Sequence, residues 1–121
     1  MKKTVIIGAT TNPSRYAYIA AEMFAKNNIP FEPVGIKKGI VFGKEILNLN
    51  EKPIIEDVDT ITLYIGSRHQ PEWYDYFLSL KPKRIIFNPG TENAELINLA
   101  KENNIEATIA CTLVLISSNQ Y

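Results

Sequence analysis

The chain has 121 residues, of which 45% are hydrophobic and 21% are charged, so we expect one compact domain spanning residues 1–121 rather than two. Thirteen basic side chains balance thirteen acidic ones, so no net charge would attract nucleic acid or an anionic membrane, and any anion site must be local. A single cysteine excludes an internal disulfide and a cysteine-based metal cage, and we expect no metal site.

The N-terminal segment contains too short an apolar run for a signal peptide or a membrane span. Only Val5, Ile6 and Ile7 are consecutive apolar residues before Gly8. We therefore expect a cytoplasmic protein that does not enter a membrane.

The first predicted strand and the helix after it form the most informative stretch of the sequence. Residues 5–7 are β-branched, as in a strand covered on both faces of a parallel sheet, and Gly8 allows a sharp turn at its end. Pro13 suits the first position of a helix, and Asn12 suits the cap before it. We predict a helix from about Ser14 to Lys26. Its predicted buried stripe consists of Tyr16, Ile19, Ala20, Met23 and Phe24.

This strand-turn-helix unit predicts a phosphate site. The first N–H groups of a helix have no partner within the helix, and they carry the positive end of its dipole. The dinucleotide fingerprint G-x-G-x-x-G is incomplete, because Thr10 and Pro13 stand where its second and third glycines would follow Gly8. A strand-turn-helix unit that binds no ligand therefore remains the alternative interpretation.

Two lysines follow the second predicted strand, Phe31–Ile36. In dinucleotide-binding folds the residue after this strand contacts the adenosine ribose, with an acidic residue for NAD and a cation for a phosphorylated ribose. Lys37 and Lys38 therefore favour NADP or coenzyme A over NAD, since both carry an additional phosphate on that ribose. The alternative is a pair of solvated loop lysines.

The middle of the chain contains a third core strand and a second helix. Residues 39–59 show mixed signals, which indicate short strands and turns. Thr60–Ile65 is a clear strand that Gly66 ends, and Pro71 then marks the start of a helix. The predicted buried stripe of that helix consists of Trp73, Tyr76, Phe77 and Leu80.

The last third of the chain predicts two more strands and one helix. Arg84–Phe87 is a strand, and Asn88–Gly90 is a strong turn signal after it. We expect Thr91 to cap the next helix and Ala107–Ala110 to form the last parallel strand. The predicted buried residues of that helix are Leu96, Leu99 and Ala100.

Five strands that alternate with helices predict an α/β fold with a mainly parallel five-stranded sheet between two helix layers. In such sheets ligands bind beyond the carboxyl ends of the strands, where the strand order reverses. Four small or polar clusters occupy these strand ends, and we expect them to converge on one edge. They are Gly8-Ala9-Thr10, Lys37-Lys38, Gly66-Ser67-Arg68 and Asn88-Pro89-Gly90.

The order and spacing of these motifs resemble the coenzyme A-binding domain family, which is similar to the N-terminal domain of the succinyl-CoA synthetase α subunit. The resemblance covers nearly the whole chain and includes Cys111, where the family pattern also has a cysteine. It implies a Rossmann-like fold that binds coenzyme A or an acyl-CoA. The matching segments read VIIGATTNPSRYAY, PVGIKKG, TLYIG and NPGTENAELINLAKENNIEATIAC.

Carried over residue by residue, the resemblance implies a binding site with three parts. The loop from Gly8 to Tyr16 would hold the phosphates, and Lys37 or Lys38 would bind the 3′-phosphate. The ends of two later strands would form the path of the adenine and the pantetheine. The candidate cofactor-binding residues are Gly8, Ala9, Thr10, Asn12, Arg15, Tyr16, Lys37, Lys38, Ile65, Gly66, Ser67, Asn88, Pro89 and Gly90.

The sequence contains no arrangement of residues that indicates catalysis. His69 beside Arg68 is the one candidate acid–base group, and a structural role in its loop is the alternative. We expect a small protein that binds coenzyme A or an acyl-CoA without catalysing a reaction. The alternatives are an NADP-dependent oxidoreductase and a regulatory or assembly module that binds no nucleotide. Exposed sheet edges are compatible with a homodimer.

Overall fold

A sheet of six parallel strands forms the centre of the computed structural model, which describes residues 2–121. The strand order is β5-β2-β1-β6-β7-β8, so the order reverses between β1 and β6. The parallel α/β, Rossmann-like fold is therefore confirmed, with one strand more than the five expected. The strands are β1 (Lys3–Ile7), β2 (Phe31–Gly35), β5 (Leu47–Asn48), β6 (Val58–Leu63), β7 (Arg84–Phe87) and β8 (Glu106–Ile109).

The central strands are buried on both faces. In β1, Val5, Ile6 and Ile7 have no exposed surface. Because side chains alternate along a strand, Val5 and Ile7 enter one core while Ile6 enters the other. This explains the uninterrupted β-branched run, since a strand between two helix layers has no solvent face that would require a polar residue.

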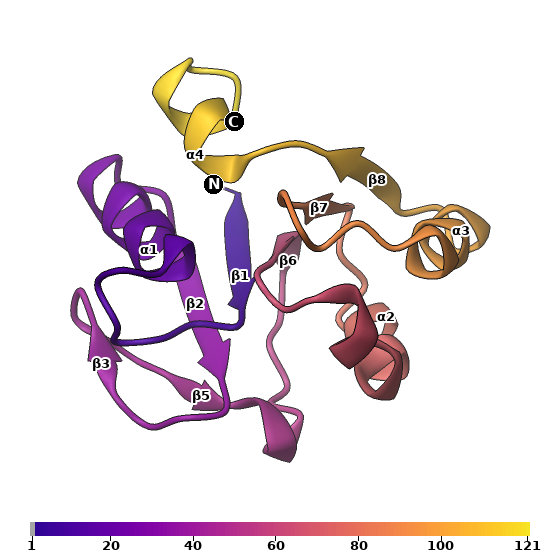
Figure 1. Cartoon of the computed structure of the whole chain (residues 1–121), viewed down its shortest axis with the longest axis horizontal. Coiled ribbons are helices and arrows are strands. Elements are labelled where there is room, and N and C mark those ends of the chain that lie inside the picture. Colours follow the sequence, from indigo (N-terminus) through magenta and orange to yellow (C-terminus); the bar gives the residue numbers. More distant parts are fainter. Residues whose placement is uncertain (1) are drawn as a thin grey trace.

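Helices cover the two faces of the sheet in pairs. The helices α1 (Tyr16–Lys26) and α4 (Thr112–Ser117) lie over one face, and α2 (Tyr74–Ser79) and α3 (Ala94–Glu102) lie over the other (Figure 1). No helix within residues 2–121 is long and apolar enough to cross a membrane. Single 3-10 turns complete the helical elements: η1 (Leu49–Glu51), η2 (Ser67–His69) and η3 (Pro71–Trp73).

Helix α1 begins later than predicted, and its buried face matches the prediction only at Ala20 and Phe24. The Asn12 side chain accepts hydrogen bonds from the N–H and the hydroxyl of Ser14, which makes a local turn instead of a helix cap. The helix then starts at Tyr16, whose side chain is 69% exposed rather than buried. Small side chains on the other face let the helix lie close to the sheet. Its buried residues are Ala17, Ala20, Ala21 and Phe24.

The aromatic stripe predicted for the second helix is confirmed, although that helix is shorter. Pro71 starts the 3-10 turn η3, and α2 begins only at Tyr74. The stripe packs into the core on this face of the sheet. Its residues, all buried, are Trp73, Tyr76, Phe77 and Leu80.

Asn93, not Thr91, caps α3. The Asn93 side-chain oxygen accepts hydrogen bonds from the N–H groups of Glu95 and Leu96. The hydroxyl of Thr91 instead donates to the backbone oxygen of Asn88, so it closes the turn after β7. Thr91 and Asn93 are both suitable as cap residues, and Asn93, which directly precedes the helix, forms the cap.

The segment between β2 and β6 contains short elements, as expected. The strands β3 (Ile40–Val41) and β4 (Lys44–Glu45) form a small antiparallel hairpin. The two-residue strand β5 then adds to the edge of the main sheet beside β2. A strand this short has no periodic signal, which is why the sequence did not predict it.

We predict that Gly35→Ala destabilises the protein. A Cβ at this position would clash with the carbonyl oxygen of Ala9, which packs against the end of β2. Backbone cannot yield as a flexible side chain does, so we expect a loss of about 1–3 kcal/mol in the free energy of unfolding, measured by chemical denaturation.

The matched control is Gly66→Ala. A Cβ at Gly66 would meet no atom within 4 Å, and its φ of −63° suits any residue. Its unfolding free energy should equal that of the unaltered protein. Equal stability of the two variants would contradict the close packing at Gly35.

Candidate functional site

A cavity of about 600 Å³ lies at the carboxyl edge of the sheet, over the ends of β1, β2, β6 and β7. It spans the point where the strand order reverses, which is where parallel α/β sheets bind ligands. Most of the residues proposed from the sequence line this cavity. They are Gly8, Ala9, Thr10, Arg15, Tyr16, Lys37, Ile65, Gly66, Pro89 and Gly90.

The loop after β1 is tied to the end of β2. The N–H groups of Gly8 and Ala9 both donate to the carbonyl oxygen of Val34, at 2.9 and 3.0 Å. Gly8 has a φ of +97°, and a Cβ there would lie 2.9 Å from the backbone oxygen of Tyr64. These two residues therefore shape the wall of the cavity, and their own N–H groups are already used.

Free backbone donors occur instead at the start of α1. The N–H groups of Tyr16 and Ala17 have no hydrogen-bond partner among residues 2–121, as expected for the first turn of a helix. Both residues line the cavity. The positive end of the helix dipole therefore adjoins the cavity.

Two cations line the same side of the cavity. Arg15 precedes α1, and Lys37 follows β2. Neither forms an ion pair within the described part of the chain, and no carboxylate is among the cavity-lining residues. This side of the cavity is therefore electropositive and suited to an anion.

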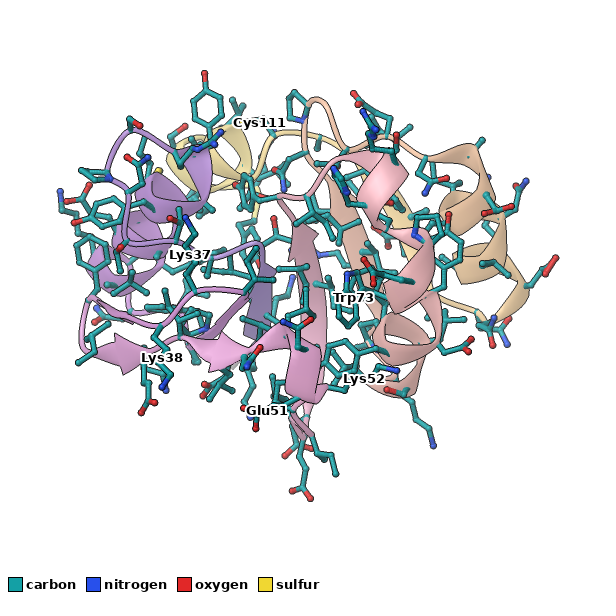
Figure 2. The ribbon with its side chains drawn as sticks, turned by 60° about the horizontal axis from the view of Figure 1, so that its bottom comes forward. Lys37, Lys38, Glu51, Lys52, Trp73 and Cys111 are labelled. Atoms are coloured by element: carbon teal, nitrogen blue, oxygen red, sulfur yellow. The ribbon has the colours of Figure 1, made fainter. Side chains whose placement is uncertain are left out.

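The two neighbouring lysines differ in position. Lys37 lines the cavity, whereas Lys38 does not. Figure 2 shows Lys38 near the outer edge of the molecule and Lys37 further inside. Lys37 is therefore placed to contact a ligand in the cavity and Lys38 is not, although the sequence pattern does not distinguish the two lysines.

On the side of the cavity formed by β6 and β7 no lining residue is charged, and the one carboxylate close to it, that of Glu92, accepts a hydrogen bond from the N–H of Gly90 at 2.8 Å. Its lining residues include Ile65 and Gly66 after β6, and Pro89 and Gly90 after β7. Tyr64 also lines the cavity, but its hydroxyl is buried, and this burial raises its pKa to about 12. This side suits an uncharged part of a ligand.

Asn88 lies beneath the cavity and not in its wall. Its side chain is buried, and the amide nitrogen donates to the Thr62 hydroxyl and the Leu63 carbonyl at 2.6 and 2.8 Å. Its amide oxygen accepts from the N–H of Thr112 at 2.8 Å. Asn88 therefore links the ends of β6 and β7 to the start of α4, and its amide is not available to a ligand.

The remaining sequence-predicted residues also lie outside the cavity lining. Asn12 forms the turn before α1, and Ser67 is exposed in η2. The candidate acid–base residue His69 is exposed and lies outside the lining, as does Cys111, which Figure 2 places beside α4. Residues 2–121 contain no group of histidine, cysteine or carboxylate side chains that could hold a metal ion.

Several lining residues were missed by sequence reasoning. Gly35 and Ile36 directly precede Lys37, and Tyr64 directly precedes Ile65, so their place at strand ends was a usable signal. Leu49 comes from the short 3-10 turn η1, for which the sequence has no clear signal.

Solved structures share this fold. An uncharacterized protein is 56% identical, with a TM-score of 0.96, and the alignment covers 100% of this chain and 98% of that chain. A Thermus thermophilus protein is 21% identical, with a TM-score of 0.85, and the alignment covers 99% of this chain and 90% of that chain. A hypothetical protein from Pyrococcus horikoshii is 20% identical, with a TM-score of 0.82, and the alignment covers 98% of this chain and 83% of that chain.

A search of the curated proteins found no match, whereas a protein-family model matches almost the entire chain. The family model described as "CoA binding domain" matches residues 2–117. The chain therefore belongs to the CoA-binding domain family.

Proposed function

We propose that the cavity binds coenzyme A or an acyl-CoA. The observation that carries the proposal is the electropositive side of the cavity, where Arg15 and Lys37 adjoin the N–H groups at the start of α1. Among residues 2–121 none of these groups has a partner, and no carboxylate lines the cavity. Phosphates are the natural ligands of such a site. Membership of the CoA-binding domain family supports coenzyme A as their source.

The charge distribution suggests how the ligand is oriented. The diphosphate would lie over the start of α1 beside Arg15, and the 3′-phosphate of the ribose would contact Lys37. The uncharged pantetheine arm would then extend along Ile65, Gly66 and the loop after β7. We propose that the protein holds this ligand without transforming it.

The proposal is tested by isothermal titration with coenzyme A, acetyl-CoA, NADP and NAD, after mass spectrometry has excluded ligand carried through purification. We expect saturable binding of coenzyme A and acetyl-CoA alone. Tighter binding of NADP would favour the oxidoreductase, and binding of none of the four would favour a module without nucleotide.

We predict that Lys37 carries the preference for the 3′-phosphate. The unaltered protein should bind coenzyme A more tightly than dephospho-coenzyme A, by ~1–3 kcal/mol for a charge-assisted contact. Lys37→Ala should remove this difference, as measured by titration with both ligands. Lys38→Ala is the matched control and should retain it, because Lys38 lies outside the cavity lining. A preference that survives Lys37→Ala and is lost in Lys38→Ala would reverse the assignment.

We predict that Arg15 supplies salt-sensitive affinity. Arg15→Ala should weaken coenzyme A binding by roughly tenfold at low ionic strength, and by less at high salt, because screening already weakens the contact there. The measurement is the dissociation constant at two salt concentrations. Arg68→Ala removes an exposed arginine outside the cavity lining and should change neither value. Equal effects of the two changes would argue against a phosphate contact at Arg15.

A further inference from the structure

A buried glutamine joins the two loops that form the uncharged side of the cavity. Gln70 has no exposed surface. Its amide nitrogen donates to the backbone oxygen of Ile65 at 3.0 Å and to that of Thr91 at 2.9 Å. Ile65 follows β6 and Thr91 follows β7, and both line the cavity. The Gln70 side chain therefore fixes the distance between the loop after β6 and the loop after β7.

The glutamine is itself held in place. Its amide oxygen accepts a hydrogen bond at 2.9 Å from the side chain of Asn93, the residue that caps α3. Asn93 also donates to the Tyr74 hydroxyl at 2.7 Å, at the start of α2. Both amide hydrogens and the oxygen of Gln70 therefore have partners, and such a fully satisfied buried network specifies one arrangement of the loops.

The bond to Ile65 also sets the direction of the next N–H group. The peptide between Ile65 and Gly66 is planar and trans, so its N–H points away from the carbonyl oxygen that Gln70 holds. The Gly66 N–H has no hydrogen-bond partner within residues 2–121, and Gly66 lines the cavity. A free donor on an uncharged wall suits a neutral acceptor, whereas an anion would be drawn to the cationic side.

We propose that Gln70 is a positioning residue that holds the Ile65–Gly66 peptide so that the Gly66 N–H donates to an amide carbonyl of the pantetheine arm. This inference rests on the proposed binding of coenzyme A. It assigns a specific contact to the uncharged part of that ligand and a role to a residue that does not itself line the cavity.

The direct test replaces the Gly66 N–H with the Cδ of a proline ring. Gly66 has φ −63° and ψ 154°, a conformation that proline adopts without strain, so Gly66→Pro deletes the donor at a compatible position. Gly66→Ala is the matched control, because it adds a Cβ and keeps the N–H. The probes are coenzyme A and adenosine 3′,5′-bisphosphate, which has the phosphorylated ribose and lacks the pantetheine arm.

We expect Gly66→Pro to bind coenzyme A about three- to tenfold more weakly than Gly66→Ala, as for the loss of one hydrogen bond. Both variants should bind the bisphosphate equally. Equal affinity of the two variants for coenzyme A would overturn the inference. Failure of the unaltered protein to bind either probe would instead overturn the proposed function.

A second pair of variants tests the role of Gln70. Gln70→Met removes both donated hydrogen bonds. Tyr76→Phe is its control, because it removes a partly buried hydrogen bond to the backbone oxygen of Pro53, which does not line the cavity. Gln70→Met should weaken coenzyme A binding and leave bisphosphate binding unchanged, whereas Tyr76→Phe should change neither. Added to Gly66→Pro, Gln70→Met should cause no further loss of coenzyme A affinity. Additive losses, or equal losses for both probes, would show that Gln70 acts only through general stability and would overturn its assigned role.

Discussion

The close contact between the loop after β1 and the end of β2 is the constraint on which the rest of the site depends. The carbonyl oxygen of Val34 accepts two hydrogen bonds from this loop, and Gly35 leaves room for the carbonyl of Ala9. The loop is thereby held against the second strand. As a result, the start of α1 borders the same cavity as Lys37, which lies two residues after β2, and their positive charges act together.

The two sides of the cavity are built by different means. On the side of β1 and β2, glycines and backbone hydrogen bonds bring the chain close together, and the charges of Arg15 and Lys37 have no ion-pair partner within residues 2–121. On the side of β6 and β7, the buried amides of Asn88 and Gln70 hold the loops from beneath. Burying such amides is tolerated because their donors and acceptors are satisfied. The reversal of strand order between β1 and β6 places the two sides next to each other.

Sequence reasoning succeeded for elements whose burial is uniform or periodic and failed for short ones. The β-branched run of β1 and the aromatic stripe around α2 were predicted because each residue is buried against a helix layer or the sheet. The two-residue strand β5 and the six-residue helix α4 were missed, because so few residues show no period. The start of α1 was misplaced, because Asn12 bonds to Ser14 and makes a turn that competes with the helix.

The sequence by itself determined the parallel α/β fold and the edge of the sheet where the small and polar clusters gather, since both follow from hydrophobic periodicity and from the connections that such strands permit. Only the tertiary structure decided which members of those clusters face the cavity. Lys37 lines it and Lys38 does not, while Asn88 turns inward to bond to β6. The reason is that the direction of a side chain depends on strand pairing and on buried partners distant in the sequence, which a local pattern does not contain.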